Sequence, residues 1–345
     1  MSRRFFFRIL LVVVAVFAVL VLSRILSAQG NSGNAFGRVK EVQEKHTARL
    51  MAIKGVVGTA VGVDTEDNPN IKVFVEEPGI AGIPKKLDEV AVDVVVTGKI
   101  YPIPTYDGKT GGGTKIDPTA RFERPVPIGV STGNEGEPSA GTIGCRVKDK
   151  SGKVYALSNN HVYALENTAP IGSNVLQPGV YDGGVAPDDV IGTLSAFVPV
   201  KFDGSDNTVD AAIAIIIKDG KIPRVGNATP SNGYGTPKSD TVLASVGMPV
   251  QKYGRTTSLT KGTITGINAT VDVNYHFGRA RCVNQIIVES QTPFVKPGDS
   301  GSLMVTDPGR DPVGLIYAAN SNGKFVAACR IELVLDAFGV TIDGE

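Results

Sequence analysis

Hydrophobic positions near the amino-terminal end of the chain recur first with a helical period and then with the pattern of strands. Residues 38–53 carry apolar residues on one side and charges elsewhere, which predicts an amphipathic helix. Its apolar side holds Val39, Val42, Leu50 and Ile53. Three strand-like runs follow, over Val56–Val63, Ile71–Glu76 and Val90–Ile100. The last run is apolar enough for a central strand. Residues 36–101 are therefore predicted to form a small α+β domain.

The pattern changes twice after this domain. Residues 102–122 are rich in proline and glycine, which predicts a linker. From residue 123 to residue 345, short strand signals recur at regular intervals. They cover Thr142–Lys148, Val154–Ser158, Val190–Leu194, Ala211–Ile217, Val242–Val246, Gly262–Val271, Ile286–Ser290, Gly301–Val305, Val313–Ala318 and Lys324–Ile331. This spacing predicts an all-β sandwich or a pair of barrels, closed by a short helix over Glu332–Phe338.

Residues 1–28 have the pattern of a targeting segment. Basic residues precede an unbroken apolar run, Ile9–Leu22, which has the length of a signal-peptide core and is short for a membrane span. The flanking apolar residues would extend the run to an anchor. The only cleavage candidate, Leu26-Ser27-Ala28, has a bulky leucine, which favours an uncleaved anchor. The alternatives are a single-pass membrane protein with a cytoplasmic amino terminus, or a secreted or periplasmic protein.

Composition narrows the function classes. The formal net charge is +1, and no Lys/Arg run would form a phosphate-binding stripe, so we expect no nucleic-acid partner. No motif calls for a metal or a cofactor, and we expect neither. Three cysteines, Cys145, Cys282 and Cys329, allow at most one disulfide. A Cys282–Cys329 bond and three buried thiols both remain open.

Candidate chemistry lies near the carboxyl-terminal end, in Gly298-Asp299-Ser300-Gly301-Ser302. A serine between glycines suits a nucleophile exposed on a tight loop. The backbone N–H groups of Gly298 and Ser300 would then point at one spot, as an oxyanion hole requires. The same sequence also makes an ordinary turn, so companion residues decide its meaning.

Two companions are present. His161 follows an apolar stretch, and Asp210 stands at the head of a small apolar run. The order His161, Asp210, Ser300, with gaps of 49 and 90 residues, matches chymotrypsin, where the gaps are about 45 and about 93. At these segments the chain resembles the trypsin/chymotrypsin-like serine proteases.

The resemblance extends over residues 124–345. Gly254–Thr257 and Gly262–Val271 are similar to the second barrel of bacterial streptogrisin-type enzymes, and Gly-Asp-Ser-Gly-Ser is similar to plant narrow-leaf-type proteases. The resemblance implies a mainly β fold of two six-stranded antiparallel barrels behind the α+β domain. Two departures stand out. Ser302 replaces a second glycine, and Val162 replaces the cysteine that often follows the histidine.

The resemblance also assigns roles. Ser300 would be the nucleophile, His161 the base and Asp210 the acid that orients the imidazole. His276, in a predicted hairpin tip, is a poor candidate for the base. Substrate-pocket residues would be Phe294, Tyr317, Ala318 and Ala319, which implies a small or medium apolar residue before the scissile bond. Phe294 could instead belong to the core.

Two functions follow from the sequence. The first is an exported endopeptidase that cuts protein or peptide substrates through an acyl-enzyme and associates with the membrane through its amino-terminal segment. The second is a catalytically silent trypsin-fold module for binding or assembly. The chain contains no Ile-Val-Gly-Gly after a basic residue, so we expect no activation by a new amino terminus. An oligomer is compatible with either function.

Overall fold

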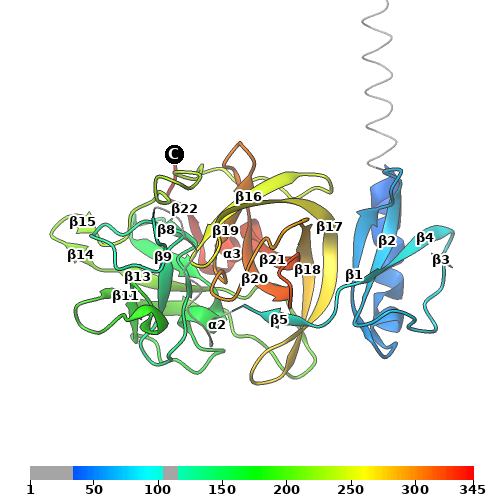
Figure 1. Cartoon of the computed structure of the whole chain (residues 1–345), viewed down its shortest axis with the longest axis horizontal. Helices are drawn as coiled ribbons and strands as arrows, with labels where there is room; N and C mark the ends of the chain where they lie inside the picture. The colour runs from blue at the N-terminus through cyan, green and yellow to red at the C-terminus, as the bar shows by residue number, and fades with distance from the viewer. Residues whose placement is uncertain (1–33, 104–115) are drawn as a thin grey trace, which may run out of the picture.

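The computed structural model describes residues 34–103 and 116–345, and these residues form a mainly β protein (Figure 1). Segment 1–28 and most of the predicted linker lie outside the described residues. The helices are residues 34–51, α2 (Asn160–Tyr163), α3 (Ile331–Phe338) and the 3-10 turn η1 (Val180–Asp182). The mainly β class is therefore confirmed, and so is the short helix near the carboxyl-terminal end.

The first sheet has eight strands in the order β22-β8-β9-β13-β11-β10-β6-β7. Their bounds are β6 (Ser131–Asn134), β7 (Gly141–Thr142), β8 (Cys145–Asp149), β9 (Val154–Ser158), β10 (Asn174–Leu176), β11 (Val190–Phe197), β13 (Ala212–Ile216) and β22 (Val340–Ile342). Within the described residues, this order is open rather than a closed six-stranded barrel. Helix α3 leads directly into β22, which pairs with β8.

The second sheet has twelve strands, and six of them form a ring. The ring consists of β16 (Pro249–Gly254), β17 (Ser258–Asn274), β18 (Arg279–Glu289), β19 (Leu303–Thr306), β20 (Pro312–Asn320) and β21 (Phe325–Arg330). A direct pairing between β17 and β18 closes it. Of the two predicted six-stranded barrels, this ring corresponds to the second. A short parallel strand, β12 (Asp206–Asn207), extends it at β18. The hairpin of β14 (Lys218–Asp219) and β15 (Ile222–Pro223) stands apart from both sheets.

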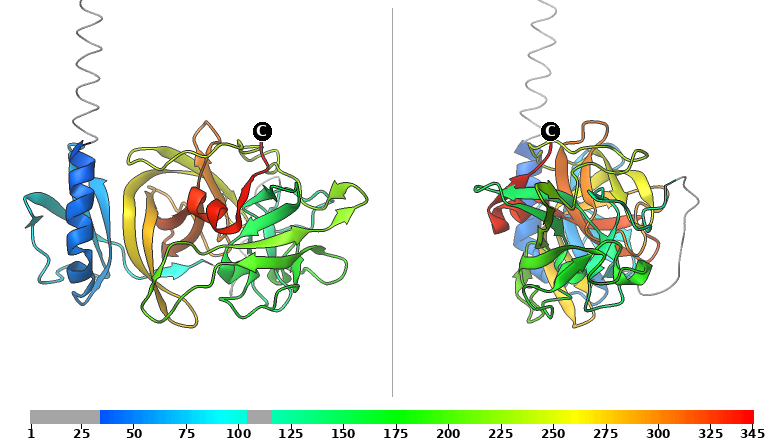
Figure 2. Two further views of the ribbon diagram at one scale, coloured as in Figure 1. Left: turned by 180° about the vertical axis from the view of Figure 1, so that it is seen from behind. Right: turned by 90° about the vertical axis from the view of Figure 1, so that its left-hand side faces the viewer.

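The amino-terminal strands extend the same second sheet. They are β1 (Val56–Val63), β2 (Pro69–Val75), β3 (Lys86–Leu87) and β4 (Val90–Val96), and β1 pairs with β17. Helix 34–51 lies on one face of these strands (Figure 2). Its apolar residues, among them Val39 and Leu50, pack in one buried cluster with Ile71 and Val73. The predicted amphipathic pattern therefore identifies the buried side of the helix.

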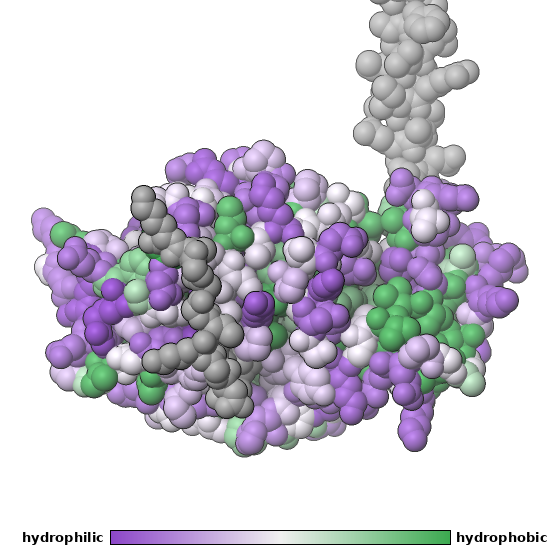
Figure 3. Space-filling model, viewed as in Figure 1, coloured by the Kyte–Doolittle hydropathy of each residue, from purple (hydrophilic) through white to green (hydrophobic). Residues whose placement is uncertain are grey.

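Two predicted strands differ in the structure. Val90–Ile100 is not one central strand, because the chain breaks at Gly98, which has a φ of 75°, and separates β4 from β5 (Ile100–Pro102). The side chains of Val94 and Val96 on β4 are 46% and 53% exposed, and Figure 3 shows a hydrophobic area over the amino-terminal strands. Val242–Val246 is an irregular segment.

The irregular segment has a simple physical cause. Its residues alternate between exposed and half-buried, and Leu243 is 65% exposed. Outside regular strands, a single backbone hydrogen bond joins it to the ring, from the N–H of Val242 to the carbonyl of Pro312. Apolar composition alone therefore does not make this segment a strand, because it lacks a partner along its length.

Candidate active site

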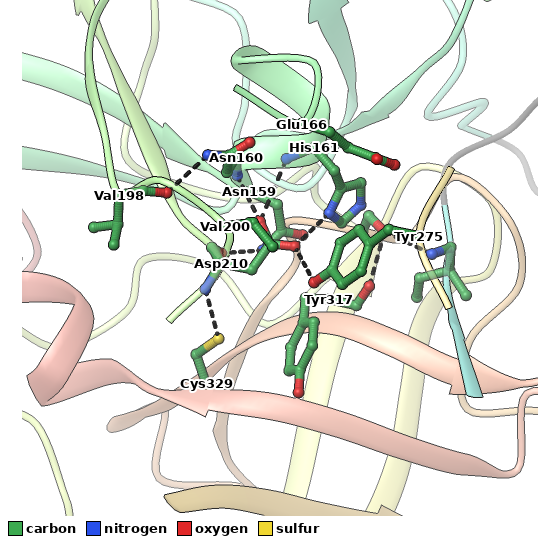
Figure 4. Close-up of polar contacts among 12 residues, drawn as sticks. Asn159, Asn160, His161, Glu166, Val198, Val200, Asp210, Tyr275, Tyr317 and Cys329 are labelled. Carbon is green, nitrogen blue, oxygen red and sulfur yellow. Dashed lines mark hydrogen bonds and ion pairs between the residues drawn. The ribbon is translucent and has the colours of Figure 1, made fainter. Parts of the chain in front are cut away.

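Strand pairing brings His161 and Asp210 together. His161 lies on α2, just after β9, and Asp210 lies just before β13; β9 and β13 pair, with Ser158 opposite Ala212. The imidazole Nδ1 of His161 lies 2.7 Å from Oδ2 of Asp210, and both side chains are almost fully buried. Oδ1 of Asp210 accepts the backbone N–H of Asn160 at 2.7 Å and that of His161 at 3.3 Å. Figure 4 shows this arrangement.

A tyrosine from the loop between β17 and β18 completes the environment of Asp210. The hydroxyl of Tyr275 donates to Oδ2 of Asp210 at 2.8 Å. Burial by itself would raise the pKa of Asp210, but the charge of His161 and the hydrogen bonds from His161 and Tyr275 outweigh it, and the pKa lies below its usual value. The acid is therefore held as a carboxylate. Burial also raises the pKa of the Tyr275 phenol, so this group stays a hydrogen-bond donor.

Ser300 lies in the loop before β19, at the junction of the two sheets. Its backbone carbonyl accepts the N–H of Thr142, which belongs to β7 of the first sheet. A Cβ at Gly141 would approach both the carbonyl of Ser300 and the side chain of Val162, the neighbour of His161. Gly301 has a φ of 88°, and a Cβ there would come within 2.2 Å of Oγ of Ser158. The glycine after the serine is therefore required by this close packing.

A second buried acid–base pair, Lys252–Asp299, includes the residue directly before Ser300. Oδ1 of Asp299 accepts the backbone N–H groups of Thr256 and Thr257, and Oδ2 accepts the N–H of Lys296 and the hydroxyl of Thr257. Nζ of Lys252 lies 3.6 Å from Oδ2, and both side chains are fully buried. Burial lowers the pKa of Lys252, while Asp299 acts in the opposite direction. Asp299 thus has a buried lysine of the same chain as its partner.

Ser300 and His161 do not share a hydrogen bond in this structure. Oγ of Ser300 accepts the backbone N–H of Ile103 at 3.2 Å and donates to the carbonyl of Tyr317 at 3.4 Å. Nε2 of His161 is buried and has no hydrogen-bond partner among the residues that the structure describes. The structure thus joins His161 to Asp210 directly and places Ser300 at the same junction with its hydroxyl engaged elsewhere.

The predicted oxyanion donor Gly298 and the predicted pocket residues lie in different surroundings. The N–H of Gly298 donates to the carbonyl of Ile103 at 2.5 Å. Phe294 and Ala319 share an apolar cluster with Ile103. The side chains of Tyr317 and Ala318 belong instead to the large core cluster. Phe294 is fully buried and therefore belongs to the core.

The remaining predicted groups have structural surroundings. His276 lies apart from the pair, and its backbone N–H donates to Oε1 of Glu166. Cys145, Cys282 and Cys329 are all free and buried, and Sγ of Cys329 accepts the N–H of Asp210 at 3.2 Å. In residues 34–103 and 116–345, no group of His, Cys, Asp or Glu could hold a metal ion. The helices in these ranges are too short or too polar to cross a membrane.

Sequence reasoning missed three contributors to the site: Tyr275, Lys252 and Ile103. Each is far from its partner along the chain, and none stands in a recognisable motif. Tyr275 lies beside His276 in the segment expected to form a hairpin tip, but no pattern connects it to Asp210. Only the pairing of the strands brings these residues together.

Known proteins that are similar to this chain are serine proteases. The serine protease Do-like HtrA of Bacillus subtilis (strain 168) is 28% identical over 181 residues, which is 52% of this chain and 34% of that protein. The chain thus spans about a third of this relative's length. The chain resembles the serine proteases, as its motifs predict. No family model matches it.

Two solved structures are also similar. A glutamic-acid-specific serine protease is 24% identical, with a TM-score of 0.45, and the match covers 63% of this chain and 100% of that one. Protease A of Thermobifida fusca is 18% identical, with a TM-score of 0.45, over 64% of this chain and 99% of that one.

Proposed function

We propose that this chain is a serine endopeptidase in which Ser300 attacks the substrate, His161 transfers the proton and Asp210 orients the imidazole. One observation carries the proposal. A buried imidazole is fixed through Nδ1 by a carboxylate, while its Nε2 has no hydrogen-bond partner among the described residues, and the chain also carries a Gly-Asp-Ser-Gly motif at Ser300. A buried nitrogen that lacks a partner costs free energy, and this cost is consistent with a nitrogen kept available to receive a proton.

The proposed reaction begins at the imidazole of His161. Nδ1–H of the neutral ring donates a hydrogen bond to Asp210, so the lone pair of the ring is on Nε2. Nε2 takes the proton of the Ser300 hydroxyl while Oγ forms a bond to the substrate carbonyl carbon, and the carbonyl oxygen becomes negative. The N–H groups of Gly298 and Ser300 would stabilise this oxygen. The imidazolium then protonates the leaving amine, the C–N bond breaks, and water hydrolyses the acyl-enzyme by the same steps.

Asp299 and Lys252 would hold the loop in the form that this reaction needs. Both carboxylate oxygens of Asp299 accept hydrogen bonds, and Nζ of Lys252 is fully buried beside them. The chain therefore needs no new amino terminus to neutralise Asp299. We infer that the loop is assembled as soon as the second sheet folds.

The amino-terminal segment gives the proposed location. The basic residues and the apolar run Ile9–Leu22 favour export of the remaining chain, with the segment as an anchor or as a cleaved signal. Cell fractionation should find the protein with membranes or outside the cytoplasm, and mass spectrometry of the amino terminus distinguishes the two forms. A cytoplasmic protein with an intact start would refute export.

A fluorophosphonate probe tests the proposed activity, because it forms a covalent adduct with an activated serine. Labelling of the full chain should go to completion on prolonged incubation, and Ser300→Ala should abolish it. Ser302→Ala is a matched control, since its hydroxyl donates to the backbone carbonyl of Asp299. Equal labelling of the Ser300→Ala variant would refute the role of Ser300. Absence of label in every folded variant would favour the silent binding module.

A further inference from the structure

We propose that Ile100–Ile103 occupies the protein's own substrate-binding site as a substrate-like strand, so that the site binds extended peptides with a bulky aliphatic residue and is autoinhibited in the intact chain. This inference rests on the proposed function. It concerns the described part of the segment between the amino-terminal strands and the first sheet (Figure 1).

The segment adds to the ring as a further strand, and its Ile100 also pairs in parallel with Val273 of β17. β5 pairs antiparallel with β20, with Pro102 opposite Ala318, Tyr101 opposite Ala319 and Ile100 opposite Asn320. It lies outside the path of the six ring strands. An extended peptide that adds to a strand edge gains affinity from the backbone and specificity from pockets for alternate side chains. β5 therefore has the geometry of a bound peptide.

Ile103 lies where the residue before the scissile bond of a substrate would lie. Its carbonyl accepts the N–H of Gly298 at 2.5 Å, and its own N–H donates to Oγ of Ser300 at 3.2 Å. One residue thus engages both the proposed oxyanion donor and the proposed nucleophile. Polar contacts on both sides of a single Cα fix the register, so Ile103 is the residue whose carbonyl would be attacked.

The side chain of Ile103 indicates the preferred substrate class. It is only 6% exposed and belongs to a cluster that includes Phe294, Ala319 and Val326. Lys252 lies behind this cluster, with Nζ 5.9 Å from the ring centroid of Phe294. Because Lys252 already pairs with Asp299, it is not available to pair with a charged group of a ligand. A pocket of this kind accepts an aliphatic side chain and rejects a charged one, because a buried charge without a partner is costly.

Open space on both sides of the segment supports the view that it fills a cleft. One hollow of about 480 Å³ is bounded by Tyr101, Pro102 and Ile103 together with residues 295–297 and 319–323. A second, of about 560 Å³, is bounded by Tyr101 and Pro102 together with Glu166, Tyr275 and His276. Tyr101 and Pro102 line both hollows and so separate them. Release of the strand would join them into one groove beside the catalytic pair.

The same contacts explain why the segment inhibits rather than reacts. The hydroxyl proton of Ser300 is directed at the carbonyl of Tyr317 and not at Nε2 of His161. The nucleophile is therefore not activated while Ile103 is in place. In the sequence, Pro104 follows Ile103, and proline restricts the residue before it to extended conformations. Because the strand is tethered, its effective concentration at the site is high, in the millimolar range or above.

The rate of fluorophosphonate labelling tests this proposal with full-length protein. Ile103→Glu places a charge in the apolar pocket and should release the strand, so that labelling becomes about tenfold faster or more. Val94→Glu is the matched control, because Val94 is 46% exposed on β4 and should leave the rate unchanged. Ile103→Ala provides a milder variant that retains the strand and should change the rate in the same direction by a smaller factor.

The outcomes separate this inference from the proposed function. Faster labelling of folded Ile103→Glu or Ile103→Ala, with Val94→Glu unchanged, supports autoinhibition. Equal rates in the wild type and both Ile103 variants overturn it, make β5 a permanent structural strand and leave Ser300 as the nucleophile. Absence of label in all folded variants removes the proposed function and this inference together. Thermal melting and circular dichroism establish which variants are folded.

Discussion

The molecule has two buried acid–base pairs, Lys252–Asp299 at the serine loop and His161–Asp210, and they differ in one respect. In the pair Lys252–Asp299, the carboxylate accepts hydrogen bonds from three backbone N–H groups and one hydroxyl, and the ammonium also donates to the carbonyl of Ser258 at 3.0 Å. In the pair His161–Asp210, the carboxylate is equally well bonded, but Nε2 of the base has no partner among the described residues. We infer that the first pair holds the loop, and we propose that the second pair receives a proton.

Removal of the reactive members should have the largest effect. We expect His161→Ala and Ser300→Ala each to lower kcat by about 10⁶-fold, since residues that act as one unit lose nearly all of their contribution together. Hydrolysis of a peptide with an aliphatic residue before the scissile bond measures this in the Ile103→Glu background. Unchanged turnover in Ser300→Ala would end the protease hypothesis.

Asp210→Asn changes the orientation of the imidazole without removing the base. The amide cannot accept the Nδ1 proton in the same way, so the ring adopts the wrong tautomer, and the rate should fall by about 10⁴-fold. The fold should persist, because the side chain keeps its size and its place beside Asn160. A rate within tenfold of the parent would show that Asp210 does not orient His161.

Lys252→Met should act on stability first. The variant leaves the carboxylate of Asp299 buried without its cation, which costs about 3–5 kcal/mol when one partner of a buried pair is removed. Urea unfolding measures the loss. Adding Asp299→Asn removes the uncompensated charge and should restore part of the stability. If Lys252→Met were as stable as the wild type, the pair would not hold the loop.

Replacement of the partly exposed Asp149 should have the smallest effect on stability, and it serves as a reference for both buried pairs. Hydrogen bonds from Ser151, Lys153 and Tyr155 lower the pKa of Asp149 from 3.8 to about 2, with the bond to the Ser151 side chain the largest cause. Its contribution to stability is therefore complete above about pH 4 and is lost as the pH falls towards about 2. Asp149→Asn should be slightly less stable than the wild type at pH 6, with a difference that disappears near pH 2 in urea titrations. A difference independent of pH would contradict this.

The sequence predicts those parts of the site that depend on local pattern. The helix over residues 34–51 and β1 follow from short-range periodicity, and His161, Asp210 and Ser300 stand in short motifs with a recognisable order. The division into residues 36–101, 102–122 and 123–345 stays a prediction. The structure adds that β1 pairs directly with β17, so the amino-terminal unit and the ring share one sheet.

Other features depend on contacts that no local pattern encodes. In the sequence, Lys252 has the pattern of an ordinary strand lysine. In the structure, β16 places its Nζ 3.6 Å from Oδ2 of Asp299. The run Val90–Ile100 reads as one strand because its valines continue, yet the turn at Gly98 separates β5 and directs it to β20. The interaction of Ile103 with Ser300 spans 197 residues. Such pairings are set by the assembled sheets, and a sequence pattern contains no information on them.

A structure of the Ile103→Glu variant after reaction with the fluorophosphonate probe tests the central claim most directly. We expect a covalent bond between phosphorus and Oγ of Ser300. We also expect a phosphoryl oxygen about 2.7–3.1 Å from the N–H groups of Gly298 and Ser300, and Nε2 of His161 within hydrogen-bond distance of the adduct. A probe bound to another residue, or an adduct on Ser300 with its oxygen turned away from Gly298 and His161, would contradict the proposed catalytic site.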